Sequence, residues 1–214
     1  MENKAILMSI RPQYVAKILN GEKTIEVRKK FPKDYVGWVY IYCTKGKKIL
    51  MAQRGNFKGF ELINTKDYGD YVYTNICECL NGKVVARFWC DKVEEIECIS
   101  VGDSDYGSLY ADTEYCTETL SEKELTQKSC VLPNEIFEYL DEDFDKVGYA
   151  IHISKLEVFD KPKELKEFYK VGAWKVFEEQ FDSSYLKREQ QEIMEELEQT
   201  ITKAPQSYMF VEGE

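Results

Sequence analysis

The sequence predicts a mixed α+β domain built around a strongly bent, mostly antiparallel sheet. Two patterns carry this prediction. Runs that alternate apolar and polar residues, or that are rich in Val, Ile, Tyr and Trp, are typical of strands. Runs with apolar residues three and four positions apart are typical of amphipathic helices. Strands are expected at residues 5–10, 24–28, 38–44, 83–96, 148–158 and 207–211.

The first candidate for function is the segment Gly21–Arg28, which follows a short amphipathic run at residues 12–20. An Asn-Gly pair ends that run, as is common at the C-terminus of a helix. The alternation that follows places Glu26 and Arg28 on the same face of a strand, with Lys23 at the strand entrance. Three charged groups this close either pair with one another, as ordinary surface ion pairs do, or hold a polar ligand.

The pattern Gly-x-Lys-x-x-Glu-x-Arg, together with the strand and helix before it, resembles the ASCH domain, a member of the PUA-like superfamily. The resemblance covers residues 1–30, and residues 83–89 and 148–159 are similar to later core elements of that family. It implies a PUA-like β-barrel with inserted helices, and a charged cleft beside the motif that binds RNA or a modified nucleobase. The expected cleft residues, the last two only if the final strand returns beside the first, are Ser9, Arg11, Lys23, Glu26, Arg28, Ser207 and Tyr208.

The length of 214 residues allows one large domain or one domain with an appendage. We expect the ASCH/PUA-like barrel over residues 1–160, a helical appendage over 161–206, and a returning strand of the barrel domain over 207–214. Within the appendage, a short helix is expected at 161–169, followed by an amphipathic helix or helix pair over 174–201.

Turns, two helices and one long loop are expected between the strands. The Asn-Gly pair at 81–82 predicts a hairpin between the strands on either side of it. Ser121 and Glu124 form a capping box that begins one helix, and Pro133 begins the next. Residues 53–75 show no period and contain many aromatic residues. We predict a loop whose aromatic side chains pin it to the body, with stacking on nucleic-acid bases as the alternative.

The charge is unevenly distributed along the chain. The net charge of −10 argues against unspecific binding of nucleic acid. However, residues 1–60 carry thirteen Lys and Arg against four Asp and Glu, a net charge of +9, and residues 61–214 carry sixteen against thirty-five, a net charge of −19. A basic first quarter that contains the charged strand favours an anionic ligand held locally. A solvated, lysine-rich surface is the alternative.

Several kinds of chemistry lack the residues they require. The single histidine, His152, lies in a predicted strand, where a structural position is expected before a catalytic one. Cys77 and Cys79 have the wrong spacing for a zinc knuckle, and no second pair of ligands follows. No phosphate-binding glycine loop or dinucleotide fingerprint occurs. We therefore expect no metal and no cofactor.

The expected compartment is the cytoplasm. The N-terminus lacks the charged-then-apolar pattern of an export signal, and no run reaches the length of a membrane-spanning helix. The seven cysteines are accordingly expected as reduced thiols, and no membrane partner is expected.

The first function hypothesis is a module that binds nucleic acid, with RNA as the expected ligand, or a modified nucleotide; a regulatory role is left open. Arg28 would hold a phosphate or a base edge with its planar guanidinium. Lys23 would add a point charge, and Glu26 would orient both cations or accept a hydrogen bond from a base amine.

A hydrolase is the second hypothesis, with Lys23 and Glu26 as catalytic candidates through general acid–base chemistry. The resemblance includes amidohydrolases that act on acetylated cytidine, and relatives proposed as ribonucleases. In those amidohydrolases a threonine nucleophile stands where this chain has Glu26. Thr24 lies about 6.5 Å away along the strand, so it is not assumed to replace that nucleophile. Glu118 is the candidate for the second acid of the family.

A third hypothesis is a protein-interaction module. The C-terminal helix is expected to have an acidic face opposite Ile193, Leu197 and Ile201. Such a helix usually packs on its own domain, and a homodimer through it is left open. The acidic face consists of Glu178, Glu179, Glu189, Glu192, Glu195, Glu196 and Glu198.

Overall fold

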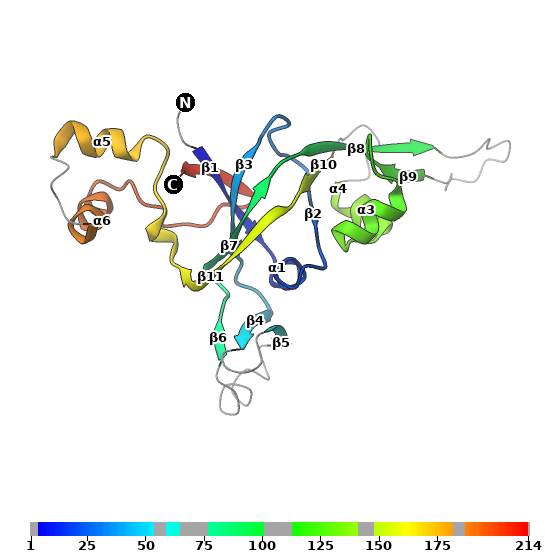
Figure 1. Ribbon diagram of the computed structural model, residues 1–214, viewed down its shortest axis with the longest axis horizontal. Coiled ribbons are helices and arrows are strands. Elements are labelled where there is room, and N and C mark those ends of the chain that lie inside the picture. The colour runs from blue at the N-terminus through cyan, green and yellow to red at the C-terminus, as the bar shows by residue number, and fades with distance from the viewer. Residues whose placement is uncertain are drawn as a thin grey trace. The chain divides into compact units, whose positions relative to one another are not determined.

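The computed structural model describes residues 4–53, 59–64, 77–100, 113–140, 148–181 and 187–213. The chain forms two compact units. Unit 1 comprises Met1–Leu19, Gly37–Phe88 and Leu156–Glu214, and unit 2 comprises Asn20–Val36 and Trp89–Lys155. Both units combine sheets with helices, so the predicted α+β class is confirmed (Figure 1).

Unit 1 is built on a five-stranded sheet. Its strands are, in spatial order, β11 (Ser154–Lys163), β7 (Val84–Cys90), β3 (Gly37–Cys43), β1 (Lys4–Ile10) and β12 (Tyr208–Glu212). Every residue of β1 except Lys4 is buried, as its apolar sequence predicts for a central strand. The last strand returns to pair with β1 in antiparallel orientation, with Met8 opposite Tyr208, whereas β3 pairs with β1 in parallel. Helix α1 (Pro12–Leu19) buries Val15, Ile18 and Leu19 at the predicted spacing.

A second sheet of unit 1 consists of β5 (Gly59–Asn64), β4 (Lys48–Gln53) and β6 (Cys77–Cys79), in that order. The hairpin predicted at residues 81–82 is wrong, because β6 pairs with β4 whereas β7 belongs to the five-stranded sheet. The Asn81 side chain bonds to β4 instead: it accepts a hydrogen bond from Leu50 N at 2.8 Å and donates one to Lys48 O at 2.9 Å. Part of the loop predicted at 53–75 is the strand β5, and most of the rest lies outside the described residues.

Unit 2 contains an antiparallel sheet and two helices. The strands are, in spatial order, β2 (Ile25–Arg28), β10 (Gly148–His152), β8 (Val93–Ser100) and β9 (Thr113–Cys116), and the helices are α3 (Glu122–Ser129) and α4 (Pro133–Leu140). The predicted capping box of Ser121 and Glu124 is confirmed at the start of α3. Leu125 of α3 and Ile136 of α4 are buried in one apolar cluster with Ala150 of the sheet. The helices thus cover one face of this sheet.

Two of the predicted strands are each divided in two. The strand predicted at 83–96 breaks at residues 91–92 into β7 and β8, and the strand predicted at 148–158 breaks at Ile153 into β10 and β11. The helix predicted at 161–169 is wrong. Only Leu165–Glu167 forms a 3-10 turn, and β11 continues to Lys163, since a residue before proline is driven out of the helical region.

The helical segment of unit 1 is a pair of helices, α5 (Ala173–Gln180) and α6 (Lys187–Glu196). Their apolar faces share a small cluster in which Phe177 and Met194 are buried and Ile193 is partly buried. The ring of Trp174 contacts those of Tyr169 and Phe177 edge to face, with centroids 5.2 and 5.9 Å apart. The apolar side of α6 is therefore used within its own unit.

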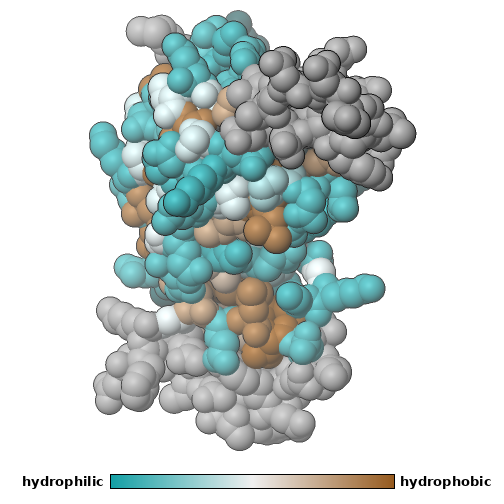
Figure 2. Space-filling model, turned by 90° about the vertical axis from the view of Figure 1, so that its right-hand side faces the viewer, coloured by the Kyte–Doolittle hydropathy of each residue, from teal (hydrophilic) through white to brown (hydrophobic). Residues whose placement is uncertain are grey.

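Large exposed apolar side chains are scattered along the described chain. They are Val36, Leu132, Tyr139, Val158, Trp174 and Phe210. On the face shown in Figure 2, hydrophilic residues cover most of the described surface, with smaller hydrophobic areas between them. Among the described residues, no helix is long and apolar enough to cross a membrane.

Candidate functional site

Lys23, Glu26 and Arg28 form a buried cluster of charges in unit 2. Lys23 Nζ lies 3.2 Å from one carboxylate oxygen of Glu26, and Arg28 Nη2 lies 2.8 Å from the other. The side chains are 1%, 7% and 9% exposed, in the order Lys23, Glu26, Arg28. The cluster therefore differs from a solvated surface pair, because the attraction between its charges is screened less than in water.

The end of α3 places the lysine of this cluster. Lys23 Nζ donates a hydrogen bond of 2.6 Å to Ser129 O, and Thr24 N donates one of 2.8 Å to Lys128 O. Both acceptors belong to the last turn of α3, where backbone carbonyls lack helical partners and a cation is favoured by the helix dipole. Gly21, at a φ of 76°, turns the chain into this position.

Burial dominates the protonation of Lys23. It lowers the pKa of the ammonium below 10.5, because an apolar environment disfavours the charged form. The charge of Glu26 and its hydrogen bond oppose this shift, and Cys130 opposes it further, whereas Arg28 adds to it. Two cationic groups surround one carboxylate, so loss of a proton from Lys23 leaves a balanced pair of Glu26 and Arg28 beside a neutral amine.

The antiparallel register adds a tyrosine beside the guanidinium. Tyr149 of β10 lies opposite Arg28 of β2, and Glu95 of β8 lies opposite Tyr149. Directly opposite residues project from the same face of a sheet, so these three side chains form a row. Tyr149 is half-buried. At the outer end of the row, Glu95 pairs with Lys33 at 3.1 Å.

The other predicted site residues belong to unit 1. Ser9 lies at the end of β1, where its N donates a hydrogen bond to Ser207 O at 2.9 Å and its Oγ donates one to Pro205 O at 2.7 Å. Tyr208 lies next to Ser207 and its ring contacts that of Phe210. The structure thus brings Ser9, Ser207 and Tyr208 together in unit 1.

Arg11 is also in unit 1, where it is exposed in front of α1 and its carbonyl accepts from the first turn of that helix. Thr24 lies at the entrance to β2 in unit 2 and is engaged through its backbone N–H. Glu118 lies in unit 2 and is exposed in the turn before α3.

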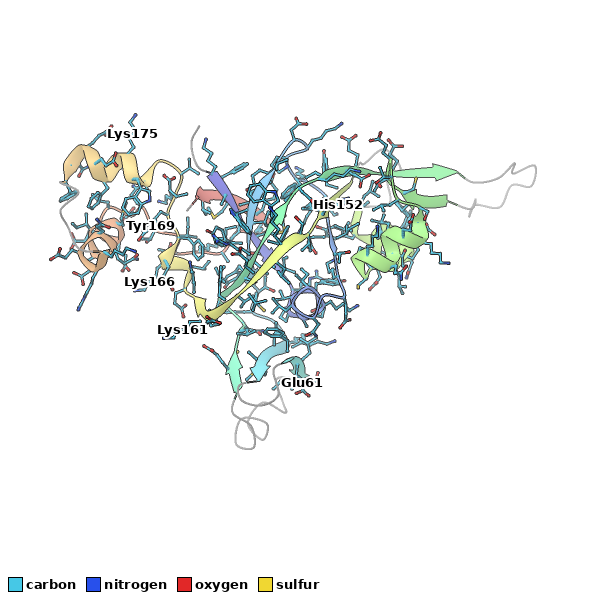
Figure 3. All side chains as sticks on the ribbon, viewed as in Figure 1. Glu61, His152, Lys161, Lys166, Tyr169 and Lys175 are labelled. Carbon is cyan, nitrogen blue, oxygen red and sulfur yellow. The ribbon has the colours of Figure 1, made fainter. Side chains whose placement is uncertain are left out.

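A second buried carboxylate of unit 2, Glu94, was not singled out by the sequence. Its Oε1 accepts hydrogen bonds from Thr117 Oγ1 at 3.0 Å and from N and Oγ1 of Thr119 at 3.1 and 2.7 Å, and lies 3.2 Å from Lys92 Nζ. Its Oε2 lies 2.5 Å from Nε2 of His152, the residue labelled on β10 in Figure 3. A sequence signal existed: alternation in β8 places Glu94 on the apolar face with Ile96.

Hydrogen bonding decides the charge state of Glu94. Burial alone raises the pKa of this carboxyl, but bonds from Thr119, His152, Thr117 and Lys92 together hold the pKa at about 2, below the usual 4.5. The cluster therefore keeps a carboxylate ionised inside the unit. Neither charged cluster offers a metal site, since no group of three potential ligands occurs among the described residues.

Comparisons with known proteins identify similar structures only. No family model matches the chain, and no curated protein matches it. The solved structure of an ASCH protein from Zymomonas mobilis is 13% identical, with a TM-score of 0.43 over 93% of this chain and 97% of that chain. A tyrosine-to-phenylalanine variant of that protein is 12% identical, with a TM-score of 0.42 over 92% of this chain and 98% of that chain. The solved structures to which the chain is similar are thus of an ASCH protein, the family that the segment Gly21–Arg28 resembles.

Proposed function

We propose that unit 2 binds nucleic acid, with RNA as the main ligand, or a modified nucleotide, at the face of its sheet that carries Glu26, Arg28 and Tyr149. The observation that carries this proposal is the buried cluster in which Lys23 and Arg28 surround the single carboxylate of Glu26. A cluster with more cationic than anionic groups in a weakly screened position attracts an anionic ligand.

Each residue of the cluster has a separate role in this proposal. Arg28 contacts the ligand, because its fork of N–H groups matches a phosphate or a base edge. Lys23 is the least exposed of the three and already bonds to Ser129 O, so it acts from behind by fixing the carboxylate of Glu26. Tyr149 offers a ring beside Arg28, on which a nucleobase can stack. This ring favours a nucleotide over a simple inorganic anion.

The test is a filter-binding titration of the full chain with structured RNA, single-stranded RNA and mononucleotides. Retention is expected at low salt and should decline as salt rises, because phosphate contacts release counterions. Arg28→Ala should weaken binding at least tenfold, and Arg28→Lys should restore it only in part, since lysine lacks the fork. Arg188→Ala is the matched control, because the Arg188 side chain is 90% exposed on α6.

The contribution of the ring is tested separately. Tyr149→Phe should retain binding of RNA, and Tyr149→Ala should weaken it by about 1–3 kcal/mol if a base stacks on the ring. Failure of every RNA and nucleotide to bind at low salt would overturn the proposal. Equal binding by wild type and Arg28→Ala would move the binding surface to another part of the chain.

A second candidate function is hydrolysis of a modified nucleoside or of RNA, and one observation favours it. The lowered pKa of Lys23 makes a neutral amine more accessible beside the carboxylate of Glu26, and a neutral amine can act as a general base. Glu26 would then activate water where the amidohydrolases have a threonine. Lys23→Ala and Glu26→Gln should each lower turnover of N4-acetylcytidine or RNA by about 10²- to 10⁴-fold. Absence of turnover in wild type, with ligand still bound, would leave a binding module.

A further inference from the structure

The turn that Glu94 holds leads directly into α3. Thr117 N donates to Leu120 O at 2.9 Å and Leu120 N donates to Thr117 Oγ1 at 3.0 Å, so the turn is closed on itself. Ser121 follows as the N-cap of α3, and its hydroxyl accepts from Glu124 N. The contacts of Glu94 with this turn therefore fix where α3 begins.

The end of the same helix holds the proposed binding cluster. Helix α3 has eight residues, a length of about 12 Å at 1.5 Å per residue. Its last residue, Ser129, accepts the hydrogen bond from Lys23 Nζ, and Lys128 O accepts the one from Thr24 N. The buried Leu125 packs the middle of the helix into the core of unit 2. Helix α3 thus joins the turn that Glu94 contacts to the carbonyl that accepts from Lys23.

We propose that Glu94 and His152 regulate the binding cluster through α3, as a pair of positioning residues that respond to pH. This inference rests on the function proposed above, because the regulated group is Lys23 of the same cluster. Neither Glu94 nor His152 contacts the ligand. They fix the start of α3, and α3 fixes the lysine that orients Glu26.

His152 supplies the pH response. Histidine is the side chain whose ordinary pKa, about 6.5, makes its charge change between pH 5 and 8. Its ring contacts Glu94 of β8, and Lys92 pairs with the same carboxylate. The apolar Ile25 of β2 lies opposite His152, and the turn before α3, which also carries the exposed Glu118, bonds to Glu94 through threonine hydroxyls. Protonation of the ring adds an ion pair to a carboxylate that stays ionised over this range. Glu94 and His152 therefore hold the start of α3 most firmly at the acidic end of this pH range.

The first test needs no ligand. The ¹⁵N chemical shift of Lys23 Nζ is followed from pH 5 to 8 in the full chain, with the signal assigned by its absence in Lys23→Met. In wild type the signal should show an inflection between pH 5 and 8, and His152→Gln should abolish the inflection while leaving the fold intact. Glu94→Gln should abolish it too, whereas Glu97→Gln, an exposed change on the same strand, should not.

The second test measures binding of a synthetic RNA oligonucleotide without terminal phosphates, whose charge is constant over this pH range. The affinity of wild type should be at least about fivefold higher at pH 5.5 than at pH 8. A change of about fivefold is the low end of ordinary coupling between two sites. His152→Gln should reduce that ratio of affinities. Any pH dependence of binding that remains in this variant is due to the protonation of Lys23 itself.

The two measurements separate the two proposals. A Lys23 signal without an inflection between pH 5 and 8 in wild type, or with the same inflection in His152→Gln, overturns the regulation whether or not RNA binds. An inflection that depends on His152, in a protein that binds no RNA or nucleotide, upholds the coupling through α3 and overturns the binding function. If Glu94→Gln is too unstable to measure, His152→Gln and His152→Asn decide the question, since both keep a hydrogen-bonding side chain without a titrating ring.

Discussion

Glu26 and Glu94 are two buried carboxylates in one unit, and their surroundings differ. They are 5% and 4% exposed, and both lie on strands of the four-stranded sheet. Glu26 is held by two cationic side chains, Lys23 and Arg28. Glu94 is held mostly by hydroxyl and N–H donors of Thr117 and Thr119, with one lysine and one histidine at its edge.

This difference underlies the proposal that the first cluster binds a ligand, whereas the second holds the fold. A carboxylate with its donors supplied by neutral groups is satisfied by the fold itself and needs no further partner. A carboxylate shared between two cations leaves an excess of positive groups, which a ligand can use. The register also places the two carboxylates on opposite faces of the sheet. Glu94 lies in one cross-strand row with Ala150 and Val27, whereas Glu26 lies in the neighbouring row with Ile151 and Val93.

The largest effect is expected from Glu26→Gln. The substitution removes the carboxylate charge and leaves Lys23 and Arg28 buried next to each other. Breaking a buried ion pair from one side costs about 3–5 kcal/mol, so urea unfolding at pH 7 should show a loss of this size. Glu97→Gln, on the exposed side of β8, should change the free energy of unfolding by less than about 0.5 kcal/mol. Equal small losses in both variants would show that the cluster is more hydrated than its burial indicates.

Acid unfolding compares the two carboxylates in a second way. The pKa of Glu94 in the folded state is about 2, against 4.5 for an ordinary glutamate, so folding depresses it. A depressed pKa contributes stability that is present above about pH 4.5 and is lost as the pH falls toward 2, about 3 kcal/mol in all. Glu94→Gln should therefore flatten the decline of stability between pH 4.5 and 2. An acid-unfolding curve unchanged by this substitution would contradict the hydrogen-bonding account of Glu94.

The sequence predicted one of these carboxylates and not the other, for a physical reason. The Lys23, Glu26 and Arg28 cluster is local, so alternation along one strand was sufficient to place its charges together. The Glu94 cluster joins residues that are 23 to 58 positions apart, and only the pairing of β10 with β8 and the turn before α3 bring them together. Tyr149 was missed likewise, because the sequence shows which face it shares with Ile151 but not that β2 is the neighbouring strand.

The fold was likewise predictable where the signal in the sequence is local. Six strand regions, the first helix and the capping box at Ser121 follow from periodicity and local chemistry, and the structure contains each of them. The failed hairpin at residues 81–82 shows where local signals end. An Asn-Gly pair is a turn in either case, but the side chain of Asn81 bonds to β4, and the strands on either side of the turn enter different sheets.

The smallest effect on stability at neutral pH is expected from Lys23→Met, although Lys23 is one of the largest fully buried side chains among the described residues. Methionine fills a similar volume, and the substitution leaves Glu26 and Arg28 as a balanced pair, while the hydrogen bond to Ser129 O is lost. The loss of this bond and the relief of burying an ammonium oppose each other, so the net change at pH 7 should be within about 1 kcal/mol.

The pH dependence of Lys23→Met distinguishes this account from a simple packing defect. The pKa of Lys23 is lowered in the folded state, so above that value and below 10.5 the unfolded chain binds more protons than the folded one. The stability of wild type should therefore rise with pH toward 10.5, and Lys23→Met should lack this rise. Urea midpoints of both proteins at pH 7, 8.5 and 10 measure the difference. A rise of the same size in both would show that Lys23 keeps its ordinary pKa, and that this lysine is as readily charged inside the unit as in water.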